Sequence, residues 1–213
     1  MPLRVYLEEG SKRTFAVALD WPGWARSGKG AEAALETLEA YLPRYAPVVR
    51  RAGLEPPVVD GFDIVERFRG GATTDFGALD KDPGVDTAPL APGETDRLAA
   101  LMQAAWEVFD DVVAGAPAEL RKGPRGGGRD RDKILAHVVN AEASYIRKLG
   151  IRASTTGQDV PDPLWRPAVL DAVRSAQDSG ALKERGWTAR YAARRIAWHV
   201  LDHAWEIEDK SET

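Results

Sequence analysis

The segment from Tyr191 to Asp209, YAARRIAWHVLDHAWEIED, constrains the fold more than any other part of the chain. Its apolar side chains recur at close to the 3.6-residue spacing of a helix: Ala192, Ile196, Val200 and Ile207. This pattern predicts an amphipathic helix packed on a core. The helix carries His199 and His203, two of the three histidines in the protein. Residues i and i+4 lie one turn apart on one face, so both imidazoles can reach one metal ion.

The third histidine, His137, lies in a second segment with helical spacing, ILAHVVNAEASYI. Three imidazoles leave one position on a metal open for water or substrate, which is typical of catalytic sites. The chain has no cysteine, so thiolate ligands and disulfides are excluded. The alternative is that these are ordinary helix histidines. The HxxxH motif lacks the catalytic Glu of HExxH, since Val200, Leu201 and Asp202 separate its two histidines.

This arrangement resembles the DinB/YfiT-like family of metal-binding proteins over about residues 90 to 210. The resemblance is carried by His137 in RDKILAHVVNAEASYI and by His199 and His203 in RRIAWHVLDHAWEIED. It implies a four-helix bundle with one metal ligand on the second helix and an HxxxH pair on the fourth. It also implies a function, because some members are metal-dependent transferases that use a low-molecular-weight thiol such as mycothiol or bacillithiol.

Other polar residues near the three histidines are candidates for supporting roles. Imidazole ligands suit zinc and nickel, which are the metals we expect. Asp202 and Glu142 are candidates for orienting the imidazoles, although the sequence alone favours ordinary solvated carboxylates for both. Arg195 shares the histidine flank and is a candidate for binding a substrate carboxylate or phosphate; the alternative is an ion pair with a neighbouring helix. No general base is identified, so the catalytic residue stays unknown.

The N-terminal part predicts a small α+β unit. Residues 3–9 and 13–20 alternate apolar and polar side chains as two strands of a hairpin, a helix follows over residues 31–45 up to two prolines, and residues 61–69 form a further strand. The unit resembles a HicB-like antitoxin domain over about residues 3 to 45, through the turn Asp20-Trp21-Pro22-Gly23-Trp24 and the helix from Gly28 to Leu42. With no DNA-binding module after it, we favour a packing or dimerisation domain.

The predicted fold is therefore an α+β N-terminal unit followed by an all-α, up-down four-helix bundle. The unit spans residues 1–70, a linker rich in Gly, Pro and Asp spans 71–93, and the bundle spans 94–213. The bundle helices are expected at 94–114, 131–149, 165–177 and in the histidine segment. The basic, Gly-rich run 121–129 is interpreted as a flexible connection, or as a loop that closes over the metal site.

The charge and hydropathy of the chain restrict the classes of partner that it is expected to bind. The formal net charge is −4 with both signs interspersed, which argues against nucleic acid. Because no segment is apolar enough for a bilayer or a signal peptide, we expect a cytoplasmic protein acting on a small-molecule substrate, with a homodimer left open. The leading hypothesis is a metal-dependent thiol transferase or hydrolase. Two alternatives are a non-catalytic module whose N-terminal unit binds a partner, and a metal that only stabilises the helices.

Overall fold

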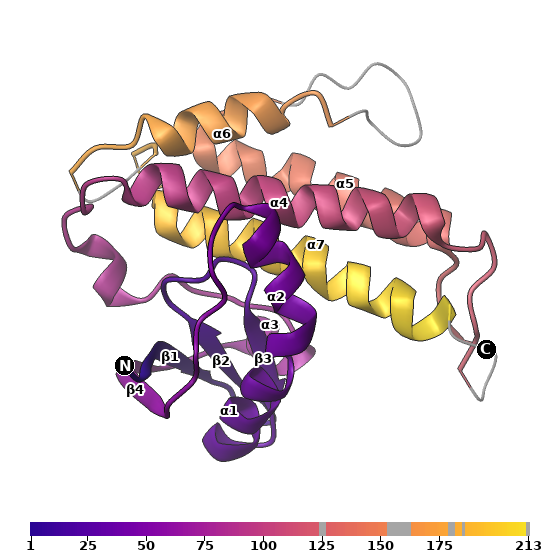
Figure 1. Cartoon of the computed structure of the whole chain (residues 1–213), viewed down its shortest axis with the longest axis horizontal. Coiled ribbons are helices and arrows are strands. Elements are labelled where there is room, and N and C mark those ends of the chain that lie inside the picture. Colours follow the sequence, from indigo (N-terminus) through magenta and orange to yellow (C-terminus); the bar gives the residue numbers. More distant parts are fainter. Residues whose placement is uncertain (124–126, 153–162, 179–181, 185, 212–213) are drawn as a thin grey trace.

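The fold is α+β, with a four-stranded mixed sheet followed by a set of helices (Figure 1). The computed structural model describes residues 1–213 except 124–126, 153–162, 179–181, 185 and 212–213. The predicted order of strands and helix in the N-terminal part is confirmed.

The sheet is built from β1 (Leu3–Glu9), β2 (Thr14–Ala18), β3 (Ala25–Gly28) and β4 (Phe62–Arg69), in the order β3-β2-β1-β4. Strand β1 pairs antiparallel with β2 and parallel with β4. Alternate side chains bury opposite faces: Val5 lies in the core shared with the helices, whereas Tyr6 lies in a second cluster on the other face. Both faces of the sheet are therefore covered.

Two helices follow β3, where the sequence predicted one. Helix α1 (Ala31–Ala40) is succeeded at once by α2 (Leu42–Arg51). The prediction that the chain leaves helix near its prolines was wrong, because Pro43 lies in the first turn of α2, where a missing N–H breaks no helical hydrogen bond. Tyr45 on α2 donates a hydrogen bond to the Pro22 carbonyl at 2.7 Å, which anchors the turn after β2 to this helix.

The segment 71–93, predicted as a linker, contains α3 (Ala72–Phe76) and the 3-10 turn η1 (Gly84–Thr87). Leu79 is buried in the second cluster against the sheet. Asp86 is also buried and forms an ion pair with Arg194 of the last helix. Residues of this segment are therefore in contact with both the sheet and the C-terminal helix.

The C-terminal helices are α4 (Glu94–Gly115), α5 (Arg131–Tyr145) with the 3-10 turn η2 (Ile146–Leu149), α6 (Arg166–Arg174) and α7 (Ala189–Ser211). Helix α7 packs along α4 and against α5, and α6 packs on α4 (Figure 1). One hydrophobic core is continuous from the sheet to these helices, joining Val5 and Trp24 to Phe109 and Val200. The N-terminal unit is thus docked directly on the helices that carry the histidines.

The Gly-rich run and the segment before α6 fall partly outside the described residues. Residues 124–126 of the Gly-rich run and residues 153–162 before α6 are among those the structure does not describe. None of the helices that it does describe combines the length and the apolar character that crossing a membrane requires.

Candidate metal centre

Helix α7 lies at the centre of the molecule and positions two of the three histidines. Every residue from Tyr191 to Leu201 is buried, because the helix is enclosed by α4, α5 and the N-terminal sheet. Only 6% of His199 and 8% of His203 is exposed. The histidine pair is therefore held in a packed environment in which its rotamers are restrained.

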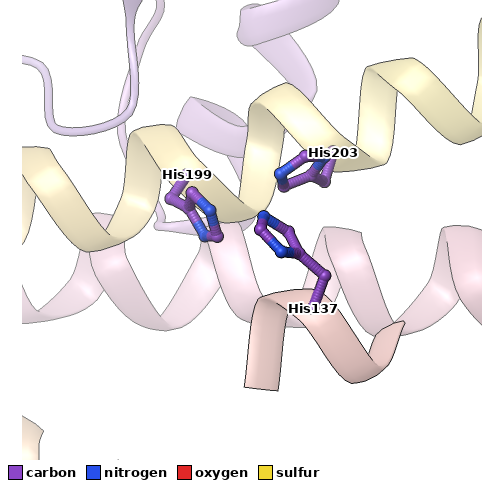
Figure 2. A group of neighbouring side chains, drawn as sticks. All are labelled: His137, His199 and His203. Carbon is purple, nitrogen blue, oxygen red and sulfur yellow. The ribbon is translucent and has the colours of Figure 1, made fainter. Parts of the chain in front are cut away.

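The structure brings the third histidine to the same point. His137 from α5 contributes a ring nitrogen that lies with those of His199 and His203 in a cluster whose ligand atoms are all within 4.8 Å of one another. Figure 2 shows the three rings turned toward one another between the two helices. Nitrogens on one tetrahedral metal lie about 3.3 Å apart for bonds of about 2.0 Å. Small side-chain rotations would thus bring the three nitrogens to metal-binding separations. Of the three histidines, His137 is the exposed one.

Glu206 orients one of the imidazoles. Nδ1 of His203 lies 2.7 Å from Oε2 of Glu206, one turn further along α7. Because an ionised carboxylate only accepts hydrogen bonds, Nδ1 carries the proton and Nε2 is left free to bind a metal. Lys210 and Arg129 also donate to this carboxylate, at 2.5 and 3.1 Å. Burial would raise the pKa of Glu206, but these hydrogen bonds and charges lower it to about 2.

The surroundings of His199 and His137 lower the pKa of each ring and so favour the neutral form that binds metals. Burial, followed by the charges of His203 and Arg195, lowers the pKa of His199 well below its usual value. The pKa of His137 is lowered for the same first reason, with Arg129 contributing. Nδ1 of His199 is enclosed and has no hydrogen-bond partner within the described parts of the chain. An orphaned buried nitrogen in a cluster of three imidazoles fits a divalent metal.

Glu206 was not a candidate from the sequence, although its position three residues after His203 is a usable signal. The two predicted carboxylates lie elsewhere. Asp202 accepts a hydrogen bond from Arg26 of β3 at 2.8 Å. Glu142 is buried and accepts from Trp106 of α4 at 2.5 Å and from Arg166 of α6 at 3.3 Å. In the described chain neither forms a hydrogen bond to an imidazole of the cluster.

Arg195 lies one turn before His199 and is packed between aromatic rings. Its guanidinium stacks over Tyr145 at 4.8 Å and over Trp198 at 4.9 Å. Tyr145 also meets His199 edge to face, with ring centroids 5.5 Å apart. Arg195 and Tyr145 therefore flank the imidazole cluster on the side toward the start of α7.

Comparisons with protein-family models, with curated protein sequences and with solved structures find no match. The functional argument therefore depends on the residues of the cluster themselves.

Proposed function

We propose that this protein is a DinB/YfiT-like, divalent-metal-dependent transferase that uses a low-molecular-weight thiol, such as mycothiol, or else a hydrolase that uses water. His137, His199 and His203 would hold the metal, with zinc or nickel as the expected ions. The observation that carries the proposal is the convergence of the only three histidines in the chain on one point, from two helices. Three protein ligands leave a coordination position open.

The proposal includes the family architecture, in which α4, α5, α6 and α7 form an up-down four-helix bundle. It is supported by the packing of α7 on α4 and α5 and of α6 on α4. The positions of the ligands also support it, because His137 lies on the second of these helices and the HxxxH pair on the fourth.

The residues around the cluster would each contribute to the chemistry. A divalent metal bound to three neutral imidazoles lowers the pKa of bound water to about 7, or holds a thiolate. Glu206 fixes the tautomer of His203, so that Nε2 faces the metal position. Tyr145 covers one edge of His199, which limits access of water from that side. The exposed ring of His137 leaves a path for a small molecule.

Cobalt(II) loading tests the proposal, because cobalt occupies imidazole sites and reports bound thiolate by absorption. We expect the cobalt protein to show a thiolate-to-cobalt charge-transfer band with 2-mercaptoethanol, saturating at about one thiol per cobalt. The His199→Ala/His203→Ala variant, matched for helical content, should show neither cobalt binding nor the band. A cobalt protein without a thiolate band, but with ester hydrolysis rising through a pKa near about 7, would instead select water.

The alternative, an N-terminal unit that binds a protein partner, gains no support from the packing of the sheet. The helix-facing side of the sheet shares its core with the C-terminal helices, and the other side packs on Trp198 of α7. A partner would have to bind at an edge strand, at a loop or on the outer faces of α1 and α2.

A further inference from the structure

Arg195 is a buried cation without a counter-charge. Only 7% of the residue is exposed, and its Nη1 is enclosed without a hydrogen-bond partner within the described segments. No carboxylate of those segments forms an ion pair with it. Its guanidinium lies over the aromatic faces of Tyr145 and Trp198, and it also interacts with the Tyr145 hydroxyl. Burying a charge without a partner costs free energy, which cation–π contacts offset only in part.

The neighbouring Arg194 shows how this fold compensates the charge of a buried arginine that has a structural role. Arg194 is equally buried, but it forms an ion pair with Asp86 and donates to the Leu19 carbonyl at 3.2 Å. The two arginines are adjacent on α7 and point to different surroundings. Arg194 is paired with Asp86 of the segment 71–93, whereas Arg195 has no carboxylate partner within the described residues.

The charges near the cluster favour an anion. Glu206 is the one carboxylate bonded to an imidazole in the described chain, and it is shared with the cations Lys210 and Arg129. The three imidazoles are neutral donors, so a bound divalent metal would add its full charge to that of Arg195. A neutral substrate would leave this excess of positive charge uncompensated in a largely enclosed site.

Arg195, Tyr145 and His199 are neighbours on one side of the cluster. Arg195 precedes His199 by one helical turn, about 6 Å along the helix axis. Tyr145 lies between them in contact with both: its face meets Arg195 and its ring meets His199 edge to face. Tyr145 is only half-buried, so its side of the cluster is the one from which a ligand carboxylate would approach the guanidinium.

We propose that Arg195, assisted by Tyr145, binds a carboxylate on the molecule that occupies the open metal position. The ligand, whether the thiol or its acceptor, would thus be an anion whose carboxylate lies beside Arg195. This inference rests on the proposed metal site and adds the chemical class of the substrate.

Two isosteric probes test it on the cobalt(II) protein: 3-mercaptopropionate, which has a carboxylate, and 3-mercapto-1-propanol, which is neutral. We expect the carboxylate probe to bind about 10- to 100-fold more tightly, as judged by the charge-transfer band. The preference should disappear in Arg195→Gln and be partly retained in Arg195→Lys. It should be unchanged in the control Arg174→Gln, which alters an exposed arginine on α6.

The outcomes separate this inference from the metal proposal. If wild-type protein binds cobalt and both thiols with equal affinity, the carboxylate site is refuted and the metal site stands; this comparison needs no variant to fold. If Arg195→Gln keeps the preference, the carboxylate lies elsewhere and the inference is likewise overturned. If no cobalt binds, both proposals fail.

Discussion

Replacement of Asp86 by Asn tests how the segment between the sheet and the helices is held. Asp86 and Arg194 are each 1% exposed and form a buried ion pair. Removing one partner of such a pair costs about 3 to 5 kcal/mol, because the other charge stays buried. We expect about 3 kcal/mol, since Asn keeps the shape and Arg194 keeps its bond to the Leu19 carbonyl. This is a large share of a typical total stability of about 5 to 15 kcal/mol.

Urea denaturation provides the assay for Asp86→Asn. A loss of about 3 kcal/mol lowers the midpoint by about 1 to 3 M at unchanged slope. The control is Asp20→Asn, because its ion pair with Arg4 has about half of each side chain exposed (47% and 49%), so it should cost less than about 1 kcal/mol. If Asp86→Asn is no more destabilising than Asp20→Asn, the buried pair does not hold the segment and the reasoning fails.

Three further predictions concern the cluster and the helices around it. Glu206→Ala removes the carboxylate that orients His203, so metal affinity should fall about 10- to 100-fold in a chelator competition; an unchanged affinity would show that Glu206 does not act through this ring. Because the pKa of His199 is lowered in the folded state, the unfolded chain takes up the proton first, and metal-free stability should be lost as pH falls below about 6.5. His199→Gln should reduce that loss in urea titrations between about pH 7.5 and 5.5, and an identical loss would contradict the assignment. Trp106→Phe leaves an oxygen of the buried Glu142 without its donor and should cost about 1 to 3 kcal/mol by thermal or urea unfolding, whereas no cost would mean that water replaces the indole.

The helical spacing of apolar residues predicted the C-terminal helices, because the side chains that a helix buries recur about every 3.6 residues. The histidine segment is the clearest case: its apolar spacing predicted a helix, and α7 extends from Ala189 to Ser211. The meeting of His137 with this helix required a further step, the resemblance to a bundle family, since nothing in the local sequence says that α5 packs on α7. The three histidines were therefore predictable as a cluster.

The partners of the supporting residues were not predictable, because they come from distant parts of the chain. Asp202 was a candidate for orienting an imidazole, but its partner is Arg26, 176 residues earlier, on an N-terminal strand. Glu142 is held by Trp106 and Arg166 from two other helices. Sequence spacing places a carboxylate on a helix, whereas tertiary packing decides which neighbour it meets.

The most direct test of the account is the metal content and coordination of the protein purified without an affinity tag. The three-histidine site predicts about one equivalent of zinc or nickel, with about three nitrogen donors near 2.0 to 2.1 Å by X-ray absorption. The His199→Ala/His203→Ala variant should lose the metal while its helical content remains. Protein that stays metal-free after incubation with zinc and with nickel at neutral pH would contradict the account, and the histidines would then be packing residues of α5 and α7.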